Sequence, residues 1–288
     1  MPLTEHHHNF SFYCNDESYS VLHCKKCGLK KTAVYKIAEK KNINLNHNIY
    51  HDYRYYFDGL ENKISNDIYN IFNSLIPLIK KEKINIFDIG CGNGEFLKRI
   101  QNTPFVSKIG GIDISADMVF KAKINSKGLF IVGNLNELKF KTEKSDFNVI
   151  TLWDVIEHVE NPDNMINNVI KNILEKDGYV IIKTINDNGI CHQLLKFLYI
   201  LTKNKKYIKY IYNQSHNTLY NKYNIRQFFL NKGFKLVKCK YYDIYFLRHL
   251  PPDMYFLKKI FFLIIRIMGI VFFMRQELIM IFKFEKNI

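Results

Sequence analysis

The stretch Ile86-Phe87-Asp88-Ile89-Gly90-Cys91-Gly92-Asn93-Gly94-Glu95-Phe96-Leu97 decides the fold of this chain of 288 residues. A short apolar run leads into three glycines at every second position, and an amphipathic segment follows. This order predicts a buried strand, a tight turn and the start of a helix. Glycine permits the positive φ and the close backbone approach that such a turn requires. We therefore expect the turn to hold a dinucleotide, a phosphate or another small molecule, with the carboxylate of Asp88 beside it.

Strand and helix patterns alternate along the chain around this stretch. We expect a helix at about 60–81, strands at 84–89, 108–113, 129–133, 146–152 and 179–185, and helices at about 94–102, 116–125 and 162–175, with a further helix containing Glu157 and His158. Alternation at this spacing predicts an α/β fold with a doubly wound, mostly parallel sheet. Ligands of such sheets lie at the carboxyl ends of the strands.

The last hundred residues predict helices inserted among the final strands. We expect helices at 191–212 and 224–232 and strands at 234–241 and 277–284. Residues 255–274 are strongly apolar but contain Lys258, Lys259 and Arg266. Because a cation near the centre of a bilayer costs about 2.5–3.5 kcal/mol, we expect an interfacial or partly buried helix here rather than a membrane span.

The net charge of +15 is concentrated in the C-terminal third. Residues 1–187 contain 24 Lys and Arg against 23 Asp and Glu, whereas residues 188–288 contain 18 against 4. With 47% hydrophobic and 24% charged residues, the composition indicates a packed globular protein rather than a disordered one. The basic region should attract an anionic partner, which could be phospholipid head groups, a phosphorylated substrate or nucleic acid. A solvated cap that is merely rich in lysine is the structural alternative.

The cysteines cluster only near the start of the chain. Cys24-Lys-Lys-Cys27-Gly28 has the form of a zinc knuckle, and Cys14 precedes it. A complete zinc site needs a fourth ligand, for which the chain offers His6, His7, His8 and His23. A decayed knuckle that binds no metal is the alternative. The other cysteines are dispersed and the first residues lack the order of a signal peptide, so we expect a reducing, cytoplasmic location.

Polar and apolar side chains gather after four of the expected strands. They are Asp88 with Gly90, Gly92 and Gly94 after the first strand, Asp113 and Ile114 after the second, Asn134 and Leu135 after the third, and Trp153 and Asp154 after the fourth. Asp113 lies about twenty residues beyond the turn, where a carboxylate can accept both hydroxyls of a ribose. The amide of Asn134 and the apolar Leu135 are placed to contact a base. This set predicts a cofactor that carries a ribose and a base.

At these positions the sequence resembles the class I S-adenosylmethionine-dependent methyltransferases, and most of all their ubiquinone-biosynthesis O-methyltransferase branch (methyltransferase type 11 or 23). The matching text is IFDIGCGNGEFL, GGIDIS, VGNLNEL and DFNVITLWDVIEHVENPDNMI, within residues 84–186. The resemblance implies a Rossmann-like sheet of seven strands whose last strand, at 277–284, is antiparallel. It also implies S-adenosylmethionine as cofactor, with the following contacts: the methionine part at Asp88, Gly90, Cys91 and Gly92, the ribose at Asp113, the adenine at Asn134 and Leu135, and the sulfonium at Trp153. Gly94 and Ile114 are further cofactor-binding candidates.

Three further residues are candidates for the chemistry of methyl transfer. Asp154, Glu157 and His158 stand at i, i+3 and i+4, so on a helix they would share one face. In the quinone enzymes the matching pattern implies a divalent-metal site next to the acceptor. His158, or else Asp154, is the candidate general base that removes the acceptor's proton. The structural alternative is that Glu157 and His158 only brace the start of the helix. His192 and His216 are weaker candidates.

These observations give a domain division and a leading function. We expect a small unit at 1–49 and a methyltransferase domain at 50–288, with a cofactor-binding core at 84–186 and a basic, apolar cap at 188–276 that faces the substrate or a membrane. The leading hypothesis is O-methyl transfer to a small, glycosyl or lipid-linked acceptor, by an enzyme that is cytoplasmic or peripheral at the inner face of the membrane. The absence of an Asn/Asp-Pro-Pro-aromatic turn after the fourth strand favours a hydroxyl acceptor. The alternatives are RNA methylation and a non-catalytic scaffold that binds the cofactor.

Overall fold

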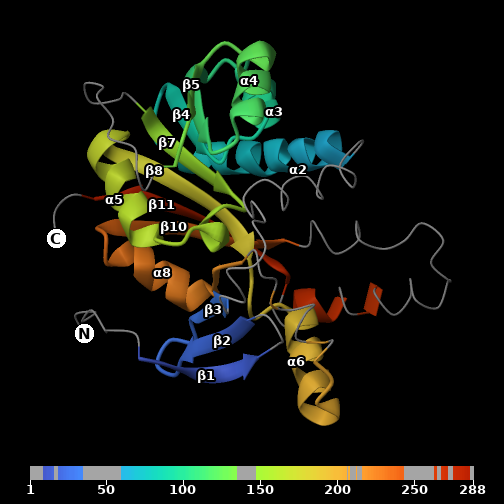
Figure 1. Cartoon of the computed structure of the whole chain (residues 1–288). Coiled ribbons are helices and arrows are strands. Elements are labelled where there is room, and N and C mark those ends of the chain that lie inside the picture. Colours follow the sequence, from blue (N-terminus) through green and yellow to red (C-terminus); the bar gives the residue numbers. More distant parts are fainter. Residues whose placement is uncertain are drawn as a thin grey trace, which may run out of the picture. The chain divides into compact units, whose positions relative to one another are not determined.

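The computed structural model of the protein describes residues 9–15, 19–34, 60–134, 147–205, 207, 212, 216–242, 263–264, 267–271 and 275–285 (Figure 1). The chain forms two compact units. One consists of Tyr35–Asn134, and the other combines Met1–Val34 with Leu135–Ile288.

Within its described residues, 60–134, the unit Tyr35–Asn134 contains three strands, with an α-helix and a 3-10 helix before the first strand and a helix after each of the first two. Its elements are α2 (Leu60–Leu75), the 3-10 helix η1 (Ile76–Leu78), β4 (Ile84–Ile89), α3 (Glu95–Ile100), β5 (Val106–Asp113), α4 (Ala116–Asn125) and β6 (Leu129–Val132). β4 is buried almost throughout: four of its six residues are apolar, and Asp88 is buried with them. Ser115 begins α4 by accepting a hydrogen bond from the N–H of Met118, as N-cap serines do.

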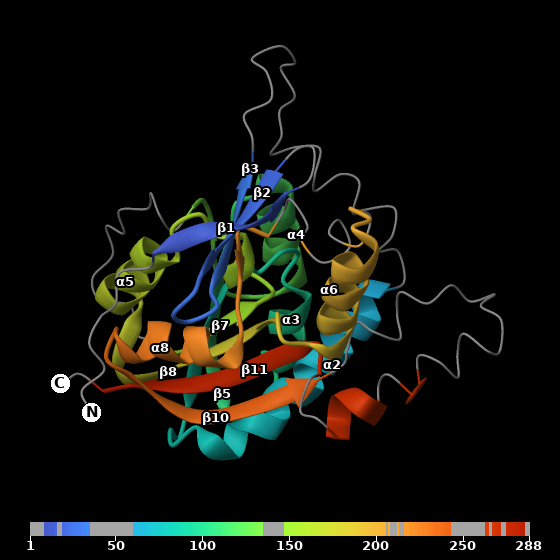
Figure 2. The same cartoon turned by 90° about the horizontal axis from the view of Figure 1, so that it is seen from below.

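The second unit contains the remaining strands and helices. Its elements are β1 (Phe10–Asn15), β2 (Tyr19–Cys24), β3 (Lys30–Val34), β7 (Phe147–Trp153), the 3-10 helix η2 (Ile156–His158), α5 (Pro162–Asn172), β8 (Leu174–Ile185), α6 (Ile190–Thr202), β9 (Thr218–Leu219), α8 (Lys222–Leu230), β10 (Phe234–Tyr242) and β11 (Glu277–Phe284). α8 lies against β10 and β11 (Figures 1 and 2). There the ring of Phe229 stacks on that of Phe282, with 4.4 Å between the ring centroids.

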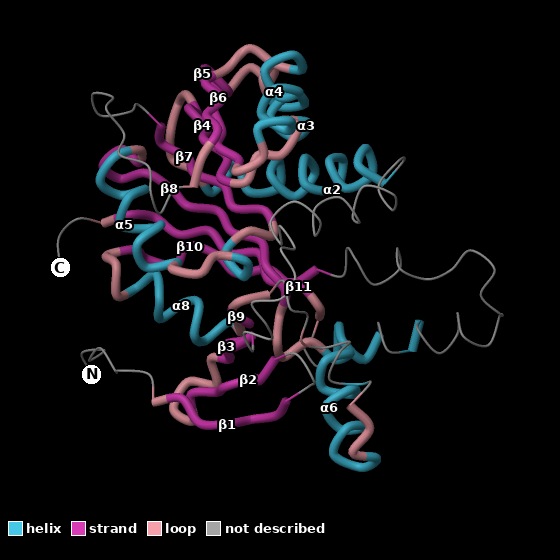
Figure 3. Tube along the Cα trace, viewed as in Figure 1, coloured by secondary structure: helices cyan, strands magenta, loops and turns pink. Residues whose placement is uncertain are grey.

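Seven strands form one sheet in the order β10-β11-β8-β7-β4-β5-β6 (Figure 3). The pairs β4–β5, β5–β6 and β7–β8 are parallel, and β11 is antiparallel to both of its neighbours. The prediction of a doubly wound, mostly parallel α/β sheet of seven strands with an antiparallel last strand is therefore confirmed.

The N-terminal residues form a second sheet that the sequence did not reveal. β1, β2 and β3 are consecutive antiparallel strands, and the short strand β9 pairs with β3, placing Lys30 opposite Leu219 and Lys31 opposite Thr218. β9 belongs to the basic C-terminal region, so an N-terminal strand and a strand from that region pair within one unit.

Three expected elements differ from the structure. The helix predicted around Glu157 and His158 is only the 3-10 turn η2, because Val159 directly after it is extended. Asp154, two residues before η2, has a φ of 56° and so lies outside the right-handed helical region. α6 ends at Thr202 rather than at 212, where Lys203 takes the left-handed conformation that closes many helices. β8 begins at Leu174, five residues before the predicted start.

The apolar stretch 255–274 lies largely outside the described residues. Its described parts, 263–264 and 267–271, are helical, and most of their side chains are exposed. Among the helices that the structure describes, none is both long enough and apolar enough to cross a membrane.

Candidate functional site

The glycine turn, residues 90–94, is held against the end of β5 by its backbone. The N–H groups of Gly90 and Cys91 both donate to the carbonyl oxygen of Ile112, at 2.8 and 3.0 Å. Gly90, Gly92 and Gly94 have φ values of 71°, 53° and 74°, which lie in the region that glycine adopts without strain. The three glycines at every second position are thus explained by the path of the turn.

The carboxylate of Asp113 fixes the turn from the neighbouring strand. One carboxylate oxygen accepts a hydrogen bond from the N–H of Gly92 at 2.9 Å, and the other accepts one from the N–H of Ser115 at 2.9 Å. Each oxygen retains a second acceptor position. The same carboxylate can therefore orient the turn and accept hydrogen bonds from a ligand hydroxyl.

Gly111 is a residue of this site that sequence reasoning did not single out. A Cβ atom built on Gly111 would lie 2.6 Å from Cβ of Cys91 and 2.8 Å from its Sγ, and 3.1 Å from the carbonyl oxygen of Asp88. The turn can pack onto β5 only because position 111 has no side chain. The pair Gly110-Gly111 before Asp113 was the available signal.

The two faces of the turn differ in their chemistry. Cys91 is buried, and its pKa is raised by that burial and then by the carboxylates of Asp88 and Asp113. Its thiol is therefore neutral and serves as packing. A Cβ built on Gly92, in contrast, would find no atom of the described residues within 4 Å. Among these residues the side of the turn at Gly92 is open, as a cradle for a small molecule requires.

The other predicted cofactor residues are dispersed. Ile114 is 54% exposed after β5, and Asn134 follows β6 in the same unit. Trp153 is the last residue of β7 and belongs to the other unit, while Leu135 lies outside the described residues. Asp88, the glycines and Asp113 are therefore brought together by β4 and β5, and the roles predicted for the rest stay predictions.

Asp154 is held on both sides by Lys183. Its backbone N–H donates to the carbonyl oxygen of Lys183 at 3.0 Å, and the ammonium of Lys183 donates to the two carboxylate oxygens of Asp154 at 2.7 and 2.5 Å. Lys183 is 1% exposed, although it lies in the apolar strand β8. A second carboxylate, that of Glu277 at the start of β11, is 3.4 Å from the same ammonium.

Glu157 points away from solvent rather than sharing an open face with its neighbours. It is buried, and its pKa is raised to about 8 by burial and then by the charge of Asp154. The expectation of one helix face for Asp154, Glu157 and His158 is wrong, because η2 is a single 3-10 turn and Asp154 precedes it in a left-handed conformation.

His158 is exposed and lies beside a second histidine. Its ring is 4.8 Å from that of His216, measured between centroids, and its carbonyl oxygen accepts a hydrogen bond from the side chain of Asn217 at 2.6 Å. Burial and then the neighbouring His158 lower the pKa of His216 to about 3. His216 is therefore neutral near pH 7, and it was only a weaker candidate in the sequence.

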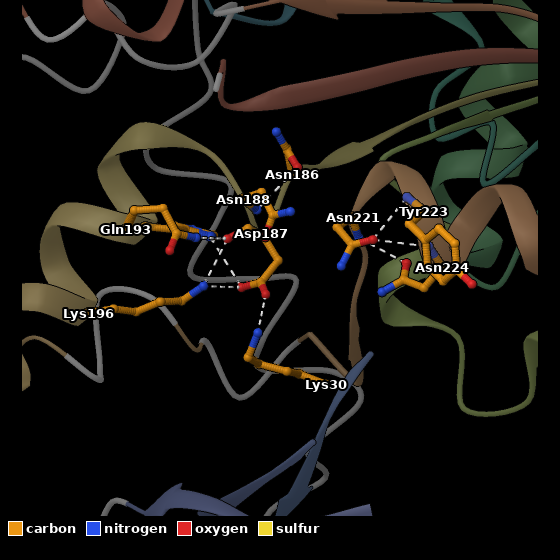
Figure 4. A network of polar contacts seen from close by, with 10 residues as sticks. Lys30, Asn186, Asp187, Asn188, Gln193, Lys196, Asn221, Tyr223 and Asn224 are labelled. Atoms are coloured by element: carbon orange, nitrogen blue, oxygen red, sulfur yellow. Dashed lines mark hydrogen bonds and ion pairs between the residues drawn. The ribbon is translucent and has the colours of Figure 1, made fainter. Parts of the chain in front are cut away.

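A third group of charges surrounds Asp187, which follows β8 and is fully buried (Figure 4). The ammonium groups of Lys30, in β3, and Lys196, in α6, both bind its carboxylate, the latter at 2.9 Å. Burial alone would raise the pKa of Asp187, but Lys196 and Lys30 hold it below its usual range. His192, with 3.8 Å between its ring nitrogen and Asp187, has its pKa lowered to about 4 by burial. The network joins the N-terminal sheet to the end of β8.

The structure brings together only two of the three predicted zinc ligands. Cys24 and Cys27 share the turn after β2, where Gly28 has a φ of 73° and donates its N–H to the carbonyl oxygen of Cys24. Cys14 instead pairs with Val21 in the strand register and packs beside Tyr212, and burial raises its pKa to about 12. His6, His7 and His8 lie outside the described residues, so a zinc site that includes them stays a prediction.

The divalent-metal site implied at Asp154, Glu157 and His158 does not fit these residues. The oxygens of Asp154 are bound by an ammonium group, Glu157 is a buried acid with a raised pKa, and His158 faces His216. Within the described part of the chain, no three His, Cys, Asp or Glu side chains converge as a metal site.

Comparisons with known proteins agree with this architecture. A family model described as a methyltransferase domain matches residues 64–239, which is more than half of the chain. The mitochondrial ubiquinone biosynthesis O-methyltransferase of Candida albicans is 28% identical over 161 residues, covering 51% of this chain and 47% of that protein. The ubiquinone biosynthesis O-methyltransferase of Glaesserella parasuis is 29% identical over 118 residues, covering 38% and 49%. The chain thus spans about half the length of these curated relatives.

Two solved structures show the same fold at low sequence identity. One is a putative methyltransferase in complex with the Haloferax volcanii Trm112 methyltransferase activator, with a TM-score of 0.55, 14% identity and coverage of 80% of this chain and 96% of that chain. The other is the plantazolicin methyltransferase BpumL with bound SAH, with a TM-score of 0.53, 19% identity and coverage of 82% and 91%.

Proposed function

Since the chain belongs to the methyltransferase-domain family, we propose that it transfers the methyl group of S-adenosylmethionine to a hydroxyl group of a small-molecule acceptor. The observation that carries this proposal is the open glycine turn whose Gly92 N–H is fixed by the carboxylate of Asp113. A turn set in advance loses little entropy on binding a ligand. A carboxylate at the end of β5 suits the ribose of that cofactor. The relatives named O-methyltransferases favour oxygen as the accepting atom.

The acceptor's proton is proposed to leave through His158. Methyl transfer from a sulfonium requires an aligned nucleophile and the removal of one proton. His158 is the exposed member of the histidine pair, and His216 beside it is neutral because burial disfavours its charged form. Asp154 is the weaker candidate base, because Lys183 binds both of its oxygens. Replacing His158 by Ala should lower turnover at saturating cofactor and leave cofactor affinity within about twofold.

The acceptor is proposed to be lipid-linked or glycosyl and to be met at an anionic membrane surface. Apolar side chains at the end of α6 are open to solvent, with Phe197, Ile200 and Leu201 exposed by 56%, 58% and 63%. The exposed Lys203 and Lys205 follow directly. Apolar side chains that enter the head-group region next to lysines are typical of peripheral membrane binding. Eleven Lys and Arg between residues 188 and 242, without a single acid, support the same partner.

Vesicle flotation tests the membrane proposal. The protein should float with vesicles that contain phosphatidylserine or cardiolipin, less so with neutral vesicles, and the double substitution Phe197→Ser with Leu201→Ser should reduce flotation several-fold. Phe120 and Ile124 on α4 are even more exposed than Phe197 and Leu201, so Phe120→Ser with Ile124→Ser is the matched control and should float as the wild type does. Equal loss in both variants, or no flotation at all, would contradict the proposal.

A transfer assay tests the enzyme itself. Labelled S-adenosylmethionine is offered with quinols, nucleotide sugars, polyprenyl-linked sugars and RNA, and the wild type is compared with Asp113→Ala. We expect label on a hydroxyl of one of the first three classes, and loss of cofactor binding in the variant. Label on RNA would establish the alternative that the basic region suggests. Cofactor binding without transfer to any acceptor of the panel would favour the scaffold.

A further inference from the structure

We propose that the ammonium group of Lys183 is the resident cation of a buried carboxylate site at the end of β7, in the place that a divalent metal was expected to take. Only the consequence of this inference for catalysis rests on the proposed function. Its evidence is the arrangement of Lys183, Asp154, Glu277 and Glu157 within one unit of the chain.

The geometry around Lys183 is that of a cation site. The ammonium nitrogen lies 2.7 and 2.5 Å from the two carboxylate oxygens of Asp154. The carboxylate therefore binds it through both oxygens, as a bidentate carboxylate binds a metal ion. It is 3.4 Å from a carboxylate oxygen of Glu277. Lys183 and Glu277 are both 1% exposed, so solvent does not screen these charges.

The strands bring these three groups together from distant parts of the sequence. Lys183 is paired with Trp153 across β7 and β8, and with Ile279 across β8 and β11. Glu277 stands two residues before Ile279, and side chains two apart on a strand share one face of the sheet. Asp154 comes directly after Trp153. The placement is therefore a consequence of sheet register rather than of a flexible loop.

A lysine at this position removes the need for an added cation and sets the conformation of the loop. Buried carboxylates without a cation are strongly unfavourable. Asp154 has a φ of 56°, which is uncommon for a residue other than glycine. Lys183 holds it through both its backbone N–H and its carboxylate. Lys183 is thus a positioning residue that fixes the chain where it enters the turn carrying Glu157 and His158.

Cation binding tests the inference without any methyl acceptor, so its failure is distinct from failure of the proposed function. Wild type, Lys183→Ala, and Lys183→Ala with Asp154→Asn are titrated with Mn²⁺ by electron paramagnetic resonance, and their thermal unfolding is followed with and without Mn²⁺. Wild type should bind no Mn²⁺ through Asp154. The midpoint of thermal unfolding of Lys183→Ala should be about 10 °C lower than that of wild type. This variant should bind Mn²⁺, and the bound Mn²⁺ should restore part of the lost midpoint. The double variant should neither bind nor recover.

Lys176, an exposed lysine of the same strand β8, provides the control. Lys176→Ala should keep the wild-type midpoint and bind no Mn²⁺. The inference is overturned if wild type binds Mn²⁺ and Asp154→Asn abolishes that binding, or if Lys183→Ala folds but no divalent cation restores it. If Lys183→Ala does not fold, Mn²⁺ binding is compared between wild type and Asp154→Asn alone. Wild type that binds no Mn²⁺ through Asp154 then supports Lys183 as the resident cation.

Discussion

At the scale of the residue, two positions without an obvious polar role control the candidate site. Gly111 contributes no atoms to a ligand, yet the turn of residues 90–94 rests on the space that it leaves beside Cys91. Lys183 follows an apolar run near the end of β8 and binds the carboxylate of Asp154.

A methyl group at position 111 should disrupt the cradle. Gly111→Ala places Cβ within 2.6 Å of Cys91 Cβ, and overpacking of this kind costs about 1–3 kcal/mol. We expect a lower midpoint of chemical unfolding and at least tenfold weaker binding of S-adenosylhomocysteine by calorimetry. Adding Cys91→Gly removes the clashing atom and should restore much of the binding. If the double variant binds no better than Gly111→Ala, the clash with Cys91 is not the cause.

Glu157 should give the protein a pH dependence of stability above its ordinary pKa. Its folded-state pKa of about 8 exceeds the unfolded value near 4.5, so between these values the unfolded chain has released a proton that the folded chain retains. The contribution of Glu157 to the unfolding free energy is therefore fully present below about pH 4.5 and is lost as the pH rises to about 8. At pH 8.5 the unfolding free energy of Glu157→Gln should exceed that of wild type by on the order of 3 kcal/mol. At pH 4.5 the two unfolding free energies should be equal. Denaturant titrations at both pH values measure this, and a constant difference would refute it.

At the scale of the element, the strands of the core were predictable and the buried charges between elements were not. β4, α4 and β11 lie where the apolar periodicity and the turn glycines placed them. These signals are local, because each is set by burial within one strand or helix. The pairing of β3 with β9 could not be predicted, because it joins segments that lie about 190 residues apart in the sequence.

The same distinction explains which site residues could be found. The cradle residues follow one another at fixed spacing along β4 and β5, so Asp88, Gly92 and Asp113 could be named from the sequence. Asp154 with Lys183, and Asp187 with Lys30, meet only through sheet register. A lysine within an apolar run, as in Val180-Ile181-Ile182-Lys183, was the one local signal of a buried partner.

The link between β3, α6 and the end of β8 depends on one carboxylate. Asp187→Asn leaves the ammonium groups of Lys30 and Lys196 buried without their counter-charge, and loss of one partner of a buried pair costs about 3–5 kcal/mol. Lys30→Met leaves Asp187 paired with Lys196 and should cost less than half as much. Unfolding free energies of the two variants give the order, and an equal or reversed order would show that Lys196 does not balance the charge of Asp187.

At the scale of the whole molecule, charge is divided along the sequence. The cradle and the first strands belong to a nearly neutral part, and the excess of cations belongs to residues 188–288. This division separates two properties that experiments can address independently. Binding of an uncharged part of a ligand depends little on the salt concentration, whereas attraction to an anionic surface depends on it strongly.

Cofactor binding should stabilise the folded chain as a whole. A ligand present at about 100 times its Kd adds roughly 2.7 kcal/mol to the unfolding free energy, and for a protein of this size the midpoint of thermal unfolding should rise by roughly 5 °C. We expect this shift with S-adenosylhomocysteine in wild type and in Lys30→Met, and none in Asp113→Ala. A shift retained in Asp113→Ala would place the cofactor away from the glycine turn.

The pairing of β3 with β9 has a consequence for the order in which the protein folds. During synthesis β1, β2 and β3 leave the ribosome well before β9, which lies about 180 residues further along the sequence. Until then β3 is an open strand edge, which is prone to pair with other chains, and Lys30 lacks Asp187. The N-terminal sheet is therefore completed late, after the strands up to β8, and a nascent chain stalled before residue 218 should be the species most dependent on chaperones.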